Sequence, residues 1–382
     1  MPTANVRLAQ LLLLAVGAYL CVGLEVSAQT ADSQTTEDAS KSWAVTTESE
    51  RKDVNPTRII ESHQQNGNRT LDKRSVQVPG FDGHFEFYQD IETETVQVDA
   101  NNVRITTRTF ARDGNGMRTL VQVTEEEEKN TVPGGDSKIV RLTSTSDLNG
   151  RFQPVRREIV ETKSIGMDTV ETNTIVMLTS INGGWAPAVK THELRKRAEN
   201  DTVETEKTTW LPDVSGNWLV SEVRQATTRQ EGTTRTTEER VSRSDSEGKL
   251  GEVSRVVSQE SESASGEKRS VVETYSIDVP GTARDGSLHL VERKTSTESS
   301  SSTGERATEQ TVEQSNPGDP GSGLRVSVLV DGRAVPGPSG KQSTVTIRDR
   351  DLNGNFGIVS VDTTKADRIP TIQVQQTPAE KP

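Results

Sequence analysis

Asp349, Asp351 and Asn353 are the residues whose spacing comes nearest to a metal site. They place carboxylate or amide oxygens at alternate positions before Gly354, as in the first half of a calcium-binding loop. The closing glutamate is missing, because Ser360 occupies its position. Tight turns also select Asp and Asn, so a plain turn is favoured. Calcium is the one cofactor that the sequence leaves open.

Phe152, Trp185 and Trp218 form a second candidate site, a binding row. They occupy equivalent positions in successive segments, so in an antiparallel meander they fall in a row across the sheet. An exposed row of aromatic rings suits stacking on sugar rings. The alternative is that they form the core, which we favour because large aromatic side chains supply much of the burial in a chain with few apolar residues.

Catalytic chemistry is poorly supported. The four histidines share no spacing with one another or with a pair of carboxylates. The sequence holds no Gly-x-Ser-x-Gly elbow, no His-Glu-x-x-His and no phosphate-binding loop. We therefore expect a non-catalytic protein with no catalytic residues.

A recurring signal organises the chain: a glycine turn followed closely by a large apolar residue. It occurs nine times, at intervals of 32 to 38 residues. A near-constant interval of this size is typical of a repeat architecture. The apolar residues are Phe85, Met117, Phe152, Trp185, Trp218, Leu250, Leu288, Leu324 and Phe356.

Each interval contains a second, more polar turn, so each unit is interpreted as two antiparallel strands. Thr and Val are abundant in these segments, and both favour strands. Asn-Gly pairs such as Asn149-Gly150 predict type I′ hairpin turns. Apolar residues gather near these turns, which predicts a packed zone there. The odd spacing from Phe152 to Val155 requires either that both faces are covered or that a bulge lies between them.

The predicted fold is all-β: a meander of antiparallel hairpins made of about nine units of about 33 residues. It forms either an extended twisted sheet or a closed or coiled ring, like a barrel or a propeller. Closure would remove the exposed edge strands that invite aggregation.

Four regions are expected. Residues 1–28 resemble a secretory signal peptide, residues 29–78 a flexible polar linker, 79–364 the hairpin domain, and 365–382 a disordered tail containing proline. Signal cleavage would remove Cys21, the one cysteine, and leave no transmembrane helix.

The formal net charge of −12 argues against nucleic acid as a partner, because binding it requires a basic surface. The predicted location is the periplasm, the cell surface or the exterior of a bacterium. Proteins or polysaccharides of the envelope are the expected partners, and the sequence does not indicate an oligomeric state.

The favoured functional interpretation is an exported structural, adhesive or binding scaffold. Two alternatives remain. One is an outer-membrane β-barrel, suggested by the signal peptide and the repeated hairpins but opposed by the scarcity of aromatic residues, which make up 3% of the chain. The other is a polysaccharide-binding or hydrolytic protein of the envelope.

Overall fold

The chain falls into two units, Met1–Ala39 and Ser40–Pro382. The computed structural model describes residues 42–51, 54–130, 135–147, 149–198, 201–277, 286–316, 323–337, 340–351 and 353–367, all in the second unit. The predicted signal peptide and all but the first three residues of the predicted tail lie outside the described residues.

The described residues form strands of 9 to 15 residues joined by short turns. The strands are β1 (Ser42–Arg51), β2 (Val54–Asn66), β3 (Arg69–Pro79), β4 (Phe85–Asp99), β5 (Asn102–Arg112), β6 (Arg118–Asn130), β7 (Ser137–Ser146), β8 (Phe152–Ser164), β9 (Thr169–Thr179), β10 (Trp185–Arg197), β11 (Val203–Pro212), β12 (Trp218–Glu231), β13 (Thr234–Ser244), β14 (Leu250–Glu262), β15 (Lys268–Ser276), β16 (His289–Ser300), β17 (Arg306–Ser315), β18 (Leu324–Gly337), β19 (Gly340–Arg350) and β20 (Phe356–Asp367).

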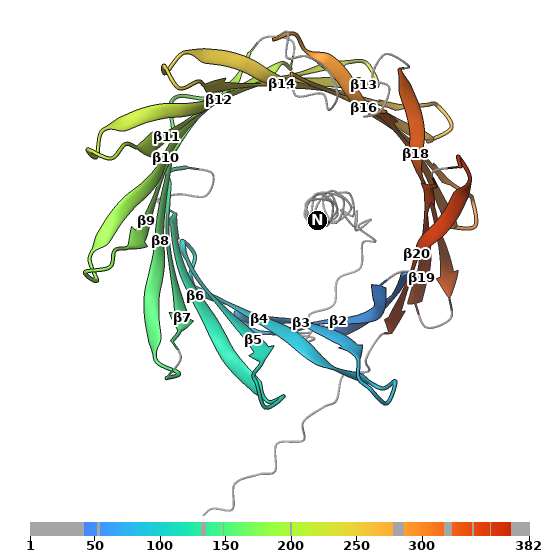
Figure 1. The fold of residues 1–382 in the computed structure, drawn as a ribbon, viewed down its shortest axis with the longest axis horizontal. Helices are drawn as coiled ribbons and strands as arrows, with labels where there is room; N and C mark the ends of the chain where they lie inside the picture. The colour runs from blue at the N-terminus through green and yellow to red at the C-terminus, as the bar shows by residue number, and fades with distance from the viewer. Residues whose placement is uncertain are drawn as a thin grey trace, which may run out of the picture. The chain divides into compact units, whose positions relative to one another are not determined.

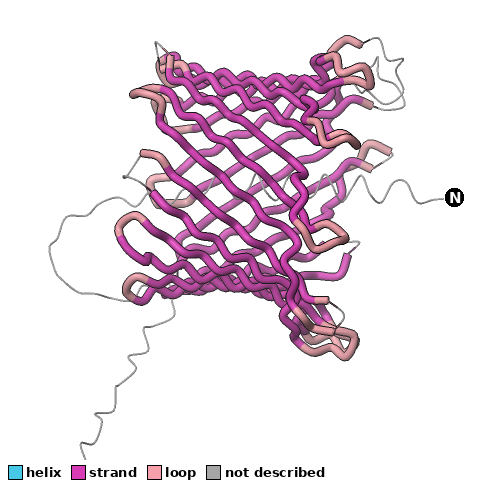
Figure 2. Tube along the Cα trace, turned by 90° about the vertical axis from the view of Figure 1, so that its left-hand side faces the viewer, coloured by secondary structure: helices cyan, strands magenta, loops and turns pink. Residues whose placement is uncertain are grey.

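These 20 strands form one antiparallel sheet that closes on itself. Each strand pairs with its neighbours in sequence, and β1 pairs with both β2 and β20. Figure 1 shows the resulting ring and Figure 2 the tilted strands of its wall. The all-β meander is therefore confirmed, in its closed, barrel-like form.

The stretch predicted as a linker differs from expectation. Within residues 29–78 the structure has β1, β2 and most of β3, and β1 is the strand that closes the ring. The stretch has an Asn-Gly pair, Asn66-Gly67, at the turn between β2 and β3, but no large apolar residue follows it closely. Its few apolar residues, such as Ile59 and Ile60, do not alternate, so sequence periodicity did not reveal these strands.

The barrel wall is a single layer with almost no buried interior. Among the described apolar side chains, only Val241, Val312 and Val330 are buried. The predicted packed zone beside the glycine turns is absent, because a sheet one layer thick has nothing to pack against. The wall is held by backbone hydrogen bonds and by side-chain pairs between neighbouring strands.

The glycine turns are three-residue loops and not the predicted type I′ turns. In the turn before β12, Gly216 donates its N–H to the Asp213 carbonyl and Asp213 donates to the Asn217 carbonyl. Gly216 has φ +83°, whereas among described non-glycine residues only Asp201 has a positive φ. This is a type I turn followed by a left-handed glycine, the next most common hairpin connection.

A β-bulge follows each glycine turn, so the bulge alternative of the sequence analysis is confirmed. In the hairpin of β7 and β8, Ser144 pairs with Pro154 and Thr143 with Arg156, which leaves Val155 without a partner. The same register shift occurs in every glycine-turn hairpin from β3–β4 to β19–β20. The extra residue shifts the alternation, so Phe152 and Arg157, an odd number of residues apart, share one face.

We predict that Gly216→Ala lowers the free energy of unfolding by about 1–2 kcal/mol, because a side chain strains the left-handed conformation. Gly251→Ala is the matched control: it also lies beside open space, but without a positive φ. Urea unfolding followed by circular dichroism measures both. Equal effects of the two substitutions would contradict this account of the turn.

Candidate functional site

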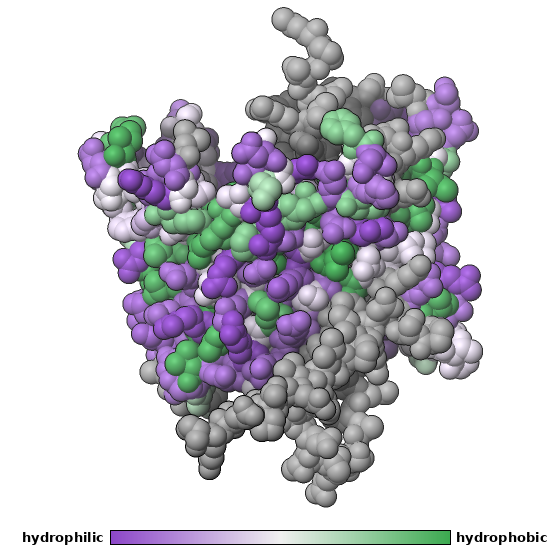
Figure 3. All heavy atoms as spheres, turned by 90° about the horizontal axis from the view of Figure 1, so that it is seen from below, coloured by the Kyte–Doolittle hydropathy of each residue, from purple (hydrophilic) through white to green (hydrophobic). Residues whose placement is uncertain are grey.

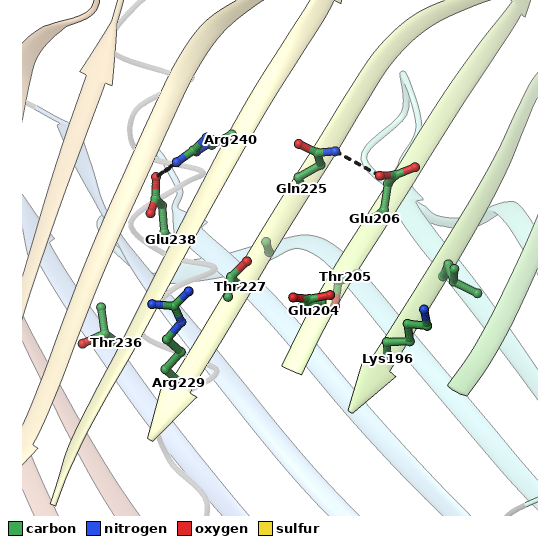
Figure 4. A pocket seen from close by; sticks show the side chains of 12 residues that line it. Lys196, Glu204, Thr205, Glu206, Gln225, Thr227, Arg229, Thr236, Glu238 and Arg240 are labelled. Carbon is green, nitrogen blue, oxygen red and sulfur yellow. Dashed lines mark hydrogen bonds and ion pairs between the residues drawn. The ribbon is translucent and has the colours of Figure 1, made fainter. Parts of the chain in front are cut away.

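The two faces of the wall can be assigned from strand register. Residues paired across strands share a face, and successive residues alternate. Gln225 pairs with Glu206 and Arg240, and Thr227 with Glu204 and Glu238. Figure 4 views these side chains from outside the barrel, with the blue and cyan strands of the opposite wall behind them. This set is therefore the outer face, and the alternating set lines the lumen.

Large apolar side chains gather on the outer face next to the glycine turns. On β12 they are Trp218 and Val220, which pair with Pro212 and Trp210 of β11. We call the corresponding ring of residues the collar. It consists of Phe85, Phe87, Phe110, Leu120, Phe152, Trp185, Trp210, Trp218, Val220, Leu250, Tyr275, Leu290, Leu324, Phe356 and Ile358.

The predicted binding row lies in the collar. Phe152, Trp185 and Trp218 are the first residues of β8, β10 and β12 and share the outer face. Their exposed fractions are 39%, 36% and 36%, so they do not form the core that the sequence analysis favours. Binding of a polysaccharide by this row stays a prediction.

Met117 does not occupy the collar position that the sequence signal assigns to it. It is an exposed turn residue, and the outward position at the start of β6 belongs to Arg118. The Arg118 guanidinium lies 3.5 Å from the centroid of the Phe110 ring. Its Nε is 2.7 Å from Asp90 Oδ2. A cation stacked on the neighbouring ring thus completes the collar here.

Below the collar the outer face carries many ion pairs, with apolar residues such as Ile159 and Ile175 among them. Arg108 lies 3.3 Å from Glu94, Arg104 3.6 Å from Glu127, and Lys138 2.7 Å from Glu161. Figure 3 shows one side of the barrel from outside, and hydrophilic side chains dominate it. An Arg or Lys facing lipid at the bilayer midplane costs about 2–4 kcal/mol, so this part of the wall is unsuited to hydrocarbon.

A shallow groove of about 520 Å³ lies on this charged outer face, across β10 to β13. Gln225 Nε2 donates to Glu206 at 2.9 Å within it. Lys196, Glu204 and Arg229 also line it (Figure 4). Its lining is almost entirely polar, which again indicates contact with water.

The lumen face carries hydroxyl groups that pair across strands. Five threonine pairs have Oγ1 atoms 3.0 to 3.3 Å apart. They are Thr47–Thr364, Thr93–Thr107, Thr124–Thr143, Thr162–Thr172 and Thr228–Thr237. In the sequence, these pairs correspond to the high frequency of threonine in the strand segments. In the sequence analysis that frequency serves only as evidence for strands and does not predict a hydroxyl-lined face.

Charged clusters also face the lumen. Arg141 lies 2.6 Å from Glu126 and 3.3 Å from Glu158, on β6 to β8. Arg224 lies 2.6 Å from Glu222 and 3.3 Å from Glu239, on β12 and β13. The lumen lining therefore includes many hydroxyls and ion pairs, which favour water and polar solutes, beside valines such as Val241.

The tips of three glycine turns carry fully exposed apolar residues, Phe81, Ile181 and Val214. Each occupies the second position of its turn, beyond the collar. Met167, at a turn at the opposite end of the strands, is also fully exposed. In the sequence analysis these positions counted only as turn residues, because a hairpin signal says nothing about what a tip contacts.

Aspartates hold the glycine turns in shape. Asp213 Oδ1 accepts the backbone N–H of Ser215 and of Asn217, both at 2.8 Å. These bonds, that from Asn217 foremost, hold the pKa of Asp213 below its usual value. Asp113 has the same arrangement, with Met117 as the main donor, and its pKa is lowered in the same way.

The three calcium candidates do not converge. Asp351 Oδ1 accepts the backbone N–H of Asn353 and Asn355 at 2.9 and 2.8 Å, so it is engaged by its own turn. Asp349 lies within β19, paired with Val328 and Gly357 on the lumen face. Within the described ranges, no group of three His, Cys, Asp or Glu side chains is placed to hold a metal ion. Calcium binding stays a prediction.

No protein-family model matches the chain, and no curated protein matches it. Among solved structures it resembles OccK2 (OpdF) of Pseudomonas aeruginosa in complex with glucuronate, with 8% identity, a TM-score of 0.39, and coverage of 88% of this chain and 100% of that chain. OpdK of the same organism, with vanillate, has 9% identity, a TM-score of 0.40, and coverage of 85% and 97%.

A loop-deletion mutant of OmpT, an outer membrane protein of Vibrio cholerae, has 7% identity, a TM-score of 0.27, and coverage of 86% and 99%. These identities and TM-scores are too low to transfer a ligand or an activity. In the described part of the chain there is no helix long and apolar enough to cross a membrane.

The favoured interpretation of the sequence, a structural, adhesive or binding scaffold, is wrong. The 20-stranded sheet is closed by the pairing of β1 with β20, and it encloses a polar lumen. This architecture fits the alternative of an outer-membrane β-barrel. The sequence analysis placed that alternative second because it counted aromatic residues over the whole chain and did not see them gathered in one ring.

We predict that Asp213→Asn changes the pH dependence of stability. Because the folded pKa of Asp213 is lowered, its charge contributes stability above the unfolded pKa of about 3.9. That contribution is lost as the pH falls through the folded value. The difference in unfolding free energy between wild type and variant is therefore expected to be constant from pH 7 to 5 and to shrink below pH 4. Urea titrations at each pH measure it, and a difference unchanged at pH 3 would contradict the assignment.

Proposed function

We propose that the protein is an outer-membrane β-barrel that holds an aqueous passage for small polar solutes. The observation that carries the proposal is the closed ring of 20 strands with a hydroxyl- and ion-pair-lined lumen. Barrels of this size leave a water-filled interior unless a plug occupies it. The threonine hydroxyls and charged groups of the lumen provide hydrogen bonds to water and to solutes.

The collar supports a membrane location. Aromatic side chains are enriched where membrane barrels meet the lipid–water interface. Here they form a ring on the outer face only, beside one end of the strands. The pattern of residues 1–28, with its apolar run and small residues at the end, supports export to the envelope.

The lumen assignment is tested with neighbouring threonines of β5. Thr107 faces the lumen, where it meets Thr93, whereas Thr106 faces outward between Arg104 and Arg108. Thr107→Cys and Thr106→Cys are made in the full chain with Cys21→Ala, which removes the one native cysteine. Membrane fractions are then treated with a small polar maleimide or with one coupled to a large dextran.

We expect the protein to sediment with outer membranes and the small reagent to label Thr107→Cys. The dextran reagent is expected to label Thr107→Cys at least tenfold more slowly than the small reagent does, since the barrel excludes it from the lumen, and Thr106→Cys is the control for the opposite face of the same strand. Recovery of the protein only in soluble fractions, or a Thr107→Cys that the small reagent does not reach, would overturn the proposal.

A further inference from the structure

We infer that the barrel inserts only its glycine-turn end, the collar together with the apolar tips, into a lipid bilayer. The rest of the charged wall stands in water. This inference rests on the proposed membrane location and specifies how the membrane is contacted. It assigns the collar and the tips to one partner, the interfacial region of a lipid leaflet.

The depth of the collar sets the limit of insertion. On β12 the apolar outward positions next to the turn are Trp218, Val220 and Val223, and Gln225 and Thr227 follow farther along the same face. The stretch from Trp218 to Val223 covers four residues of the paired strand β11, or about 13 Å. The apolar band of a spanning barrel is about 25 Å tall. The collar is therefore deep enough for an interface and too shallow for a full crossing.

Beyond the collar, charged pairs lie on the outer face among apolar residues such as Ile159 and Ile175. Arg108 with Glu94, and Arg240 with Glu238, are ion pairs on the outer face at the middle of their strands. The groove across β10 to β13 adds a hollow lined by carboxylates and cations (Figure 4). These charged groups stay hydrated only if the lipid contacts the glycine-turn end of the barrel and does not reach them.

The tips indicate the direction of insertion. Phe81, Ile181 and Val214 project fully exposed beyond the collar, on three separate glycine turns. Fully exposed apolar residues on several tips at one end of a barrel can be buried together by a flat, fluid partner.

The ring geometry and the turn charges favour a bilayer over a second copy of this chain. A collar that encircles the barrel is contacted on all sides at once by a membrane plane. Two copies placed end to end would instead bring together aspartates at several turns, among them Asp113, Asp213 and Asp351. Like charges in such an interface oppose association.

Depth is tested by tryptophan quenching in vesicles of phosphatidylcholine with brominated acyl chains. One variant of the full chain keeps Trp218 alone, with Phe at the other three tryptophan positions. A second variant has Phe at all four native tryptophan positions and adds Thr227→Trp. Its single tryptophan reporter therefore lies farther along the outer face of the same strand. We expect at least twofold quenching of Trp218 and no quenching of the reporter at position 227.

The direction is tested by vesicle flotation of Val214→Asp and Met167→Asp. Both residues are fully exposed turn residues, so neither substitution disturbs packing, but they lie at opposite ends of the barrel. Val214→Asp is expected to weaken binding at least tenfold, while Met167→Asp leaves it unchanged.

The outcomes separate the inference from the proposed function. Quenching at both positions 218 and 227, with conductance steps in a planar bilayer, would overturn the inference and keep an outer-membrane barrel that spans the bilayer. Equal weakening by Met167→Asp and Val214→Asp would overturn the direction of insertion. Quenching at neither position, with no flotation, would overturn the membrane location itself.

Discussion

Closure of the sheet is the constraint on which the rest of the structure depends. A single-layer sheet with water on both faces gains little from burial, so its backbone hydrogen bonds must be complete. The pairing of Ala44 to Arg51 in β1 with Ser360 to Asp367 in β20 leaves no open edge. Without it, two strands would present unpaired N–H and C=O groups to any other extended chain.

Closure also explains why the side chains are distributed as they are. Each face of the wall meets a different solvent compartment, and neither is a core. Cross-strand pairs then supply much of the side-chain stabilisation: threonine pairs and ion pairs in the lumen, ion pairs outside, and aromatic contacts in the collar. Exposed pairs of this kind contribute little individually, so the number of strands matters more than any one contact.

Sequence periodicity predicted much of the fold but less of the site. Asn-Gly pairs and the spacing of the apolar residues located the hairpins, and the interval from Phe152 to Val155 indicated the bulge. The strands β1 to β3 were missed because their few apolar residues, such as the adjacent Ile59 and Ile60, do not alternate. Arg118 was missed as a collar residue because a cation stacked on Phe110 replaces the expected apolar group.

Whether Phe152, Trp185 and Trp218 face a core or a solvent could not be decided from the chain alone. Alternation assigns residues to two faces, but only closure determines that one face is outside and the other encloses the lumen. The sequence located the aromatic row correctly along the strands. Which face of the barrel the row occupies is set by the pairing of β1 with β20, segments more than 300 residues apart in sequence.

The bulge after each glycine turn has a consequence for how such a chain can change. The extra residue sets the parity of the strand that follows, so losing it would turn every subsequent outward side chain of that strand into the lumen. On β12, for example, a single-residue insertion or deletion there would turn Gln225 into the lumen and bring Thr228 to the outside. Viable length changes in these hairpins must therefore come in even numbers, or as whole hairpins that bring their own bulge.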